Sequence, residues 1–218
     1  MKRVLILVEG QTEETFVRTV LAPHLLAHNL ALMPRLVVTR YNRAGGHDKG
    51  GINRYAPVKD DLRRLLGDTG AERVTTMLDY YGLPEDFPGL ASRPAGDCYK
   101  RVEHVEQMFA EDIGHRRFLP YLALHEFEAL LFTDLPRCSL FTPEAVATLQ
   151  AARDAVNSPE EINEHRETAP SKRILAVMPE YRKRLHGPQA AQEIGLSQLR
   201  AACRHFNQWL SRLEALAT

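Results

Sequence analysis

The sequence has no excess of charge of either sign, because 28 Lys and Arg side chains balance 28 Asp and Glu side chains. A formal net charge of zero excludes a bulk basic field that would draw the protein onto nucleic acid or anionic lipid, but a local basic face remains open. Cysteine is scarce, and Cys98, Cys138 and Cys203 lie far apart without a CxxC pair. Neither a thiolate zinc site nor a disulfide framework is therefore expected.

Long hydrophobic runs are also missing. The first apolar run, Val4–Val8, is too short for the core of a signal peptide or for a membrane span. We therefore expect a cytoplasmic protein without a membrane partner. The chain of 218 residues is 44% hydrophobic and 26% charged, which is typical of a globular protein with one large domain or one domain plus an appendage.

The pattern along the first part of the chain alternates between strand and helix, which predicts an α/β fold with a mainly parallel sheet of about four strands flanked by helices. Val4–Val8 is a continuous apolar run of the kind found in strands buried on both faces, and a helix capped by Thr12 is expected to follow it up to about His28. The further strands expected are Leu36–Thr39, Val74–Leu78 and Phe118–Leu124, and the further helices are Lys59–Leu66 and Tyr99–Phe109.

The pattern changes after Leu135, since no strand pattern is visible beyond it. Helices are expected over Pro143–Val156 and, at the end, over about Leu196–Leu216, with short proline-punctuated pieces between them. We interpret residues 1–135 as an α/β domain and residues 136–218 as a helical extension packed on it.

The stretch Asn42–Gly51 is rich in glycine, which permits positive φ angles and close approach of the backbone to a ligand. It matches neither the Walker pattern nor GxGxxG, so it does not indicate a nucleotide site by motif. It is either a flexible connector or a ligand-binding loop, and His47 and Asp48 in it are weak candidates for ligands.

Acidic residues follow three of the predicted strands, and the carboxyl ends of parallel strands open on the edge of a sheet where ligands bind. Carboxylates that converge there repel one another unless a cation joins them, and oxygen ligands favour Mg²⁺ or Mn²⁺. The candidate metal ligands are Glu9, Asp79, Glu126 and Glu128, with Glu13 and His125 in supporting positions. Each of these acids taken alone also fits a turn, a helix start or a solvated face.

Several motifs carry a resemblance to known families. Val8–Glu13, which reads VEGQTE after an apolar strand, resembles the opening motif of Toprim-type domains of topoisomerases, primases and overcoming-lysogenization-defect nucleases. More narrowly, the whole chain resembles the bacterial domain-of-unknown-function family 4276. The other segments that carry this narrower resemblance are Asp79–Gly82, His125–Phe132, Ala169–Ile174 and Cys203–Leu210.

The Toprim resemblance implies that Glu9 is a metal ligand or general acid/base and that Asp79 binds the metal. The pattern departs at Tyr81, which stands where the second aspartate of the Toprim DxD pair would be. Glu126 or Glu128 is then expected to replace the missing acid. Because no tyrosine is placed by motif as a nucleophile, hydrolysis is favoured over strand passage.

Basic residues supply candidates for phosphate binding. Lys172 is assigned to charge stabilisation on a transferring phosphate, and Arg173 and Lys49 to phosphate binding. The alternative for Ser171–Arg173 is a helix start with Ser171 as N-cap and a solvated basic turn. Further basic residues of the helical third form a phosphate-binding face if they share one side, and otherwise serve solubility: Arg166, Arg182, Lys183, Arg184, Arg200, Arg204 and Arg212.

Two main functions are consistent with these residues. The first is a Mg²⁺- or Mn²⁺-dependent Toprim-like nuclease that acts on nucleic acid, DNA more than RNA, in phage defence. The second is a non-catalytic metal-binding partner module of an AAA-type ATPase, because members of the resembled family are commonly encoded beside one. A third and weaker alternative is an enzyme acting on a small phosphorylated substrate.

Overall fold

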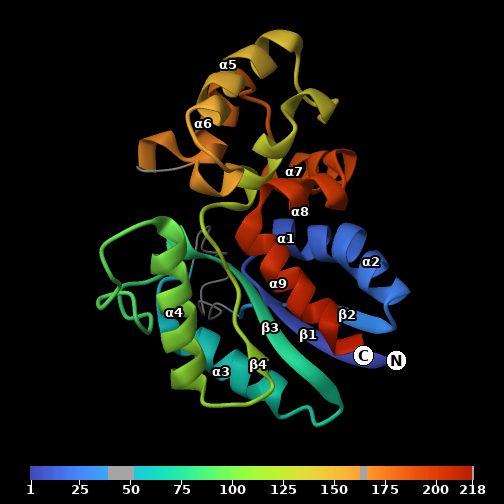
Figure 1. Ribbon diagram of the computed structural model, residues 1–218, viewed down its shortest axis with the longest axis vertical. Coiled ribbons are helices and arrows are strands. Elements are labelled where there is room, and N and C mark those ends of the chain that lie inside the picture. The colour runs from blue at the N-terminus through green and yellow to red at the C-terminus, as the bar shows by residue number, and fades with distance from the viewer. Residues whose placement is uncertain (39–51, 163–165, 218) are drawn as a thin grey trace, which may run out of the picture.

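The computed structural model describes residues 1–38, 52–162 and 166–217. Its centre is a parallel sheet of five strands in the order β2-β1-β3-β4, with β5 also paired to β3 (Figure 1). The strands are β1 (Lys2–Val8), β2 (Leu30–Leu36), β3 (Ala71–Asp79), β4 (Phe118–Leu119) and β5 (Leu122–Ala123). The predicted α/β fold with a parallel sheet and a helical C-terminal part is confirmed.

Alternate residues of β1 face two separate cores, as expected for a strand buried on both sides. Val4, Ile6 and Val8 pack with the first helices and the C-terminal helices, whereas Leu5 and Leu7 pack with α3 and α4 on the other face. The helices nearest the sheet are α1 (Gln11–Phe16), α2 (Ala22–Ala27), α3 (Tyr55–Leu66), α4 (Cys98–Ile113) and α9 (Arg204–Glu214). The π-helical turn Val17–Leu21 joins α1 to α2.

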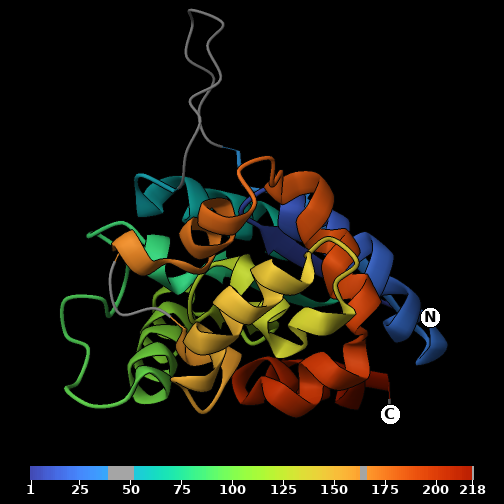
Figure 2. The ribbon, with the colours of Figure 1, turned by 90° about the horizontal axis from the view of Figure 1, so that it is seen from above.

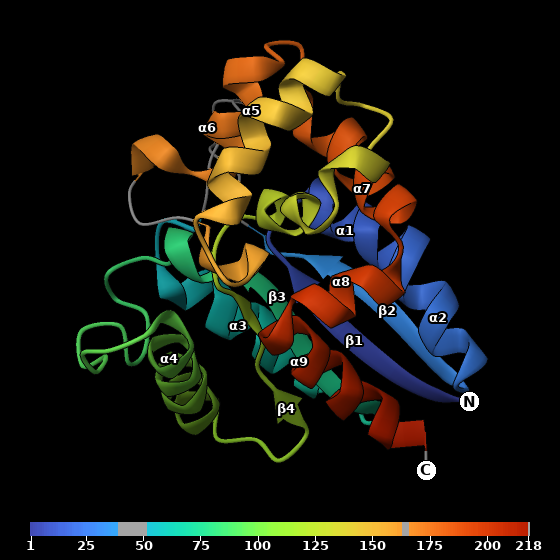
Figure 3. The ribbon, with the colours of Figure 1, turned by 45° about the horizontal axis from the view of Figure 1, so that its top comes forward.

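The C-terminal helices share one continuous core with the sheet, since Phe206 and Trp209 cluster with Ile6 and Phe16. Figure 3 shows α9 running alongside β1, with α5 and α6 at the far end of the molecule. The boundary at residue 135 stays a prediction. The remaining helices are α5 (Pro143–Asp154), α6 (Pro170–Val177), α7 (Lys183–Ile194) and α8 (Leu196–Ala202).

Four element predictions are wrong in detail. The predicted strand Phe118–Leu124 is two short strands, β4 and β5, because Pro120 between them interrupts the pairing with β3. The second strand is Leu30–Leu36 and not Leu36–Thr39, because β2 lies at the edge of the sheet, where Pro34 is tolerated within a strand. Thr39 lies outside the described residues. The helix after β1 begins at Gln11 with Gly10 as its N-cap, so Thr12 does not cap it.

The predicted last helix, Leu196–Leu216, is two helices that meet at Cys203, whose backbone is extended. The buried carboxylate of Glu160 accepts hydrogen bonds from the backbone N–H groups of His205 (3.0 Å) and Phe206 (2.8 Å). This carboxylate caps the start of α9 from another segment of the chain, which no local pattern indicates.

The two ends of the chain lie side by side in Figure 2 as in the other views. The ammonium of Lys2 donates a hydrogen bond of 2.6 Å to the carbonyl of Leu216. Within the described residues, no helix combines the length and the apolar character needed to cross a bilayer.

Candidate functional site

Glu9 and Asp79 lie next to each other because β1 and β3 are neighbouring parallel strands. Val8 pairs with Met77, so the two strands reach the same edge of the sheet together. The backbone N–H of Asp79 points to Oε2 of Glu9 at 3.4 Å. The sheet therefore brings the acids after the first and third strands to one place, as the sequence predicts.

Glu13 reaches the same edge from the first turn of α1. Its Oε2 accepts a hydrogen bond of 2.9 Å from the backbone N–H of Gly10, so the side chain also caps the helix. Burial raises the pKa of Glu13, and the nearby Glu9 carboxylate raises it further. Glu13 therefore caps the start of α1 and also lies close to Glu9.

Glu126 and Glu128 follow β5, which pairs with β3 at Leu78 and Asp79. Oε2 of Glu126 accepts a hydrogen bond of 3.0 Å from the backbone N–H of Ser171. Glu128 is almost fully buried, and the Tyr181 hydroxyl donates to its Oε1 at 3.3 Å. We refer to Glu9, Glu13, Asp79, Glu126 and Glu128 together as the acidic cluster.

Lys183, the first residue of α7, supplies a cation to the acidic cluster. Its Nζ lies 3.5 Å from Oε1 of Glu126 and 3.3 Å from Oε2 of Glu128. Burial lowers the pKa of Lys183, but attraction to Glu128, Glu126 and Asp79 outweighs burial and raises it, so the ammonium stays charged. The sequence places Lys183 in a basic run but gives no sign that it enters this site.

Within the acidic cluster, burial and the neighbouring acids change the pKa of Asp79 the most. Burial raises its pKa well above the usual value, and the other four carboxylates add to the rise, Glu9 and Glu13 most of all. Burial also raises the pKa of Glu9, with a further contribution from Glu126. The acids therefore outnumber the cation that neutralises them, which favours binding of a proton or of a further cation.

His125 lies beside the acidic cluster. It lines a small cavity together with Glu13, Asp79 and Glu126. Burial, with a smaller effect from Arg101, lowers the pKa of His125 to about 4, so its imidazole is neutral near pH 7. Its Nδ1 is buried and has no hydrogen-bond partner within the described residues.

The predicted phosphate-binding residues are placed differently from one another. Ser171 is not an N-cap, because α6 starts at Pro170 with Ala169 as the N-cap and the Ser171 N–H donates to Glu126. Lys172 is exposed in this first turn and follows Ser171, whose backbone contacts Glu126, while Arg173 uses its Nε to bind the carbonyl of Thr168 at 2.8 Å. Lys49, His47 and Asp48 lie outside the described residues.

The basic residues of the helical third do not act as one set. The Arg200 guanidinium contacts both carboxylate oxygens of Glu214, and Arg204 stacks on the ring of Tyr99 at 3.9 Å from its centre. These two side chains therefore serve packing within the protein, whereas Lys183 serves the acidic cluster.

The acidic cluster offers the oxygen donors that Mg²⁺ and Mn²⁺ prefer, but no three of its residues bring oxygens within 4.8 Å of one another in the described part of the chain. A closed cage of protein ligands is thus not assembled. Magnesium is commonly held by one or two carboxylates, with waters and substrate phosphates completing its shell. Glu9 and Asp79 at the strand ends are the two carboxylates that such a site would use.

Comparison with known families settles the membership of the chain. The model of the family described as Domain of unknown function (DUF4276) matches residues 8–214. The chain belongs to this family. No protein among those with curated descriptions and no solved structure matches it. The DUF4276 match includes every residue of the acidic cluster and Lys183.

The DUF4276 motifs noted in the sequence have physical roles in this fold. The opening and central motifs supply the acidic cluster, while the closing Cys203–Leu210 stretch contains the capped start of α9. His205 in that stretch bonds to Oε1 of Glu106 at 2.9 Å, and Trp209 donates to Oγ1 of Thr75 at 2.9 Å. The closing motif therefore fixes α9 on the sheet and on α4.

Proposed function

We propose that this protein is a Toprim-like nuclease that hydrolyses phosphodiester bonds with Mg²⁺ or Mn²⁺ and acts on DNA more than on RNA. The observation that carries the proposal is the gathering of five acids from β1, α1, β3 and the segment after β5 around a single lysine. Asp79 is central to it, because its pKa is raised by all four other acids.

Glu9 and Asp79 would hold the metal ion, which when bound supplies a Lewis acid at the phosphate and a water of lowered pKa. If Glu9 does not bind the metal directly, it would act instead as the general acid/base, because burial raises its pKa. Lys183 provides a positive charge beside the acids, where it can balance charge that develops on the phosphate. Lys172 and Arg173, in the first turn of α6, would hold neighbouring phosphates.

Hydrolysis is favoured over strand passage because no tyrosine is placed by motif as a nucleophile, and Tyr81 in the place of the second DxD aspartate weakens the case for topoisomerase or primase chemistry. The proposed biological role of this nuclease is phage defence.

The test is cleavage of supercoiled and linear DNA by the purified full chain with Mg²⁺, Mn²⁺ or chelator. We expect metal-dependent nicking or cutting that Glu9→Gln and Asp79→Asn each reduce by at least about 100-fold. Glu85→Gln is the matched control, because Glu85 is exposed and lies outside the acidic cluster. Circular dichroism must show that all variants are folded. Full activity in Glu9→Gln, or no cleavage by the wild type with either metal, would overturn the proposal.

A second function, a non-catalytic partner module of an AAA-type ATPase, is favoured by one observation. Lys183 already occupies a cation position between Glu126 and Glu128, which a degenerate metal site would show. Under this function the wild type cleaves nothing, alone or with the ATPase. It would instead co-purify with the ATPase and change the rate of ATP hydrolysis, and Lys183→Met would weaken that effect.

A further inference from the structure

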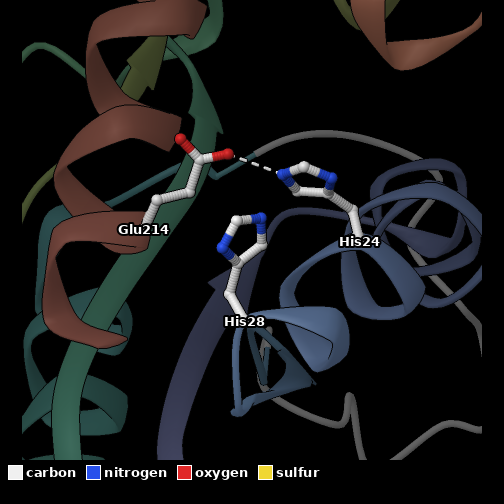
Figure 4. A group of neighbouring side chains, drawn as sticks. All are labelled: His24, His28 and Glu214. Atoms are coloured by element: carbon white, nitrogen blue, oxygen red, sulfur yellow. Dashed lines mark hydrogen bonds and ion pairs between the residues drawn. The ribbon is translucent and has the colours of Figure 1, made fainter. Parts of the chain in front are cut away.

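A second group of metal-binding side chains lies away from the acidic cluster. His24 is on α2 and His28 follows one turn later at the end of that helix, while Glu214 is the last residue of α9 (Figure 4). One ligand atom from each residue lies within 4.8 Å of the other two. Among the described residues, no other three His, Cys, Asp or Glu side chains meet that condition.

Two of the three side chains, His24 and Glu214, already share a hydrogen bond in the position where a metal ion would join them. Nε2 of His24 lies 2.6 Å from Oε1 of Glu214, and the two imidazole rings are 5.0 Å apart. Histidines four residues apart on a helix project from the same face, which is how helices commonly present a pair of metal ligands.

The surroundings orient the carboxylate. Nη2 of Arg200 lies 3.0 Å from Oε2 of Glu214, which leaves Oε1 facing the histidines. Nη1 of Arg200 also contacts Oε1. A metal bound to Oε1 would compete with that contact, and the contact between Nη2 and Oε2 would stay in place. A hydrogen bond to the outer oxygen of a ligating carboxylate is a common supporting contact in metal sites.

We propose that His24, His28 and Glu214 bind a zinc ion that fastens α9 to α2. Two imidazole nitrogens and one carboxylate oxygen form a His₂Glu set, which suits Zn²⁺ and is a poor set for Mg²⁺. His28 is exposed, so the fourth position faces solvent and takes a water molecule.

The site is separate from the acidic cluster because it lies at the amino ends of the strands, whereas the acidic cluster lies at their carboxyl ends. His28 and Asn29 directly precede β2, and Lys2 at the start of β1 pairs with Leu30. The acidic cluster follows the carboxyl ends of β1 and β3. Zinc at the α2–α9 site therefore links segments 190 residues apart in the chain without touching the proposed catalytic residues.

The test compares the melting temperature (Tm) of the metal-free full chain with and without added Zn²⁺, together with the stoichiometry from isothermal titration. We expect a Tm rise of about 5–10 °C at a hundredfold excess of zinc over its dissociation constant. His28→Ala should abolish this rise, because it removes one ligand and leaves the contacts between Arg200 and Glu214 in place. Cobalt should give the visible absorption bands of a tetrahedral site in the wild type and not in His28→Ala.

The matched control is His104→Ala, which removes a histidine from α4, where it contacts Ser92. This variant should bind zinc like the wild type, and Mg²⁺ should produce no shift that depends on His28. An equal zinc response in the wild type and His28→Ala, or no response in either, would overturn the proposal. Because DNA cleavage is not a readout, failure here leaves the proposed nuclease function unaffected.

Discussion

The ammonium nitrogen of Lys183 lies 3.3 Å from Oε2 of Glu128, and the two residues are 55 positions apart in the chain. Glu128 is among the most buried charged residues of the described chain, whereas the Lys183 side chain is 45% exposed. The lysine therefore brings a positive charge from the solvent side onto a buried acid. This contact connects the helical third of the chain to the strand ends that carry the other acids.

Replacing Lys183 with Met should leave the acidic cluster without its internal cation. We expect DNA cleavage to fall by about 100- to 1,000-fold, because a charge aimed at the phosphate is lost. Lys172→Met should reduce it less, since Lys172 is exposed and Lys183 remains in place. Cleavage rates at saturating Mg²⁺ check this prediction, and equal losses in both variants would contradict it.

Asp79→Asn should stabilise the metal-free protein above neutral pH. Since burial and the other acids raise the pKa of Asp79 in the folded state, the folded protein binds more protons than the unfolded chain. The contribution of Asp79 to stability is full below about pH 4 and falls as the pH rises through the folded pKa. We expect the variant to melt about 2–4 °C higher than the wild type at pH 8, equivalent to about 1 kcal/mol, and to match it near pH 4.

Thermal melts in chelator across that pH range would measure the difference. An exposed control, Glu85→Gln, should show no such trend. A variant less stable than the wild type at pH 8 would mean that Asp79 makes a favourable interaction instead of a repulsive one.

Glu106→Gln should destabilise the protein most near pH 6. Burial lowers the pKa of His205, but the hydrogen bond and charge of Glu106 outweigh it and raise the pKa above the ordinary 6.5. The stability from this pair is therefore fully present below pH 6.5 and is lost as the pH rises through the folded pKa. Because both side chains are buried, we expect a loss of about 3 kcal/mol in the free energy of unfolding at pH 6 and a smaller loss at pH 9.

Urea unfolding at the two pH values provides the measurement. His205→Gln is the reciprocal variant, and the two substitutions together should cost less than the sum of the single losses. A loss that is the same at pH 6 and pH 9 would show that the charge on His205 does not contribute.

Trp209→Phe should cost about 2–3 kcal/mol of the free energy of unfolding. The change leaves the buried Thr75 hydroxyl without its donor at 2.9 Å and shrinks the ring that stacks on Tyr121 at 4.4 Å. Thr75→Val removes the other partner, so a double-mutant cycle should yield a coupling of about 1 kcal/mol. Circular dichroism is the method of choice, since the sequence has one tryptophan. Strict additivity would rule out a contribution from the hydrogen bond.

Much of the fold can be predicted from local patterns. The apolar run at Val4–Val8 becomes an inner strand of the sheet, and the predicted helices Lys59–Leu66 and Tyr99–Phe109 lie within the longer helices α3 and α4. The errors come where tertiary position overrides the pattern. Pro34 is accepted because β2 is an edge strand, and α9 starts where Glu160 caps it.

The acids of the candidate site can also be predicted, because residues that follow parallel strands must meet at one edge of the sheet. The sequence by itself therefore determined the α/β fold, its family and the set of Glu9, Asp79 and their neighbours. Only the tertiary structure decided that Lys183 joins those acids and that His24 and His28 meet Glu214. The reason is distance along the chain: periodicity specifies which face of an element is apolar, but not which distant side chain packs against it.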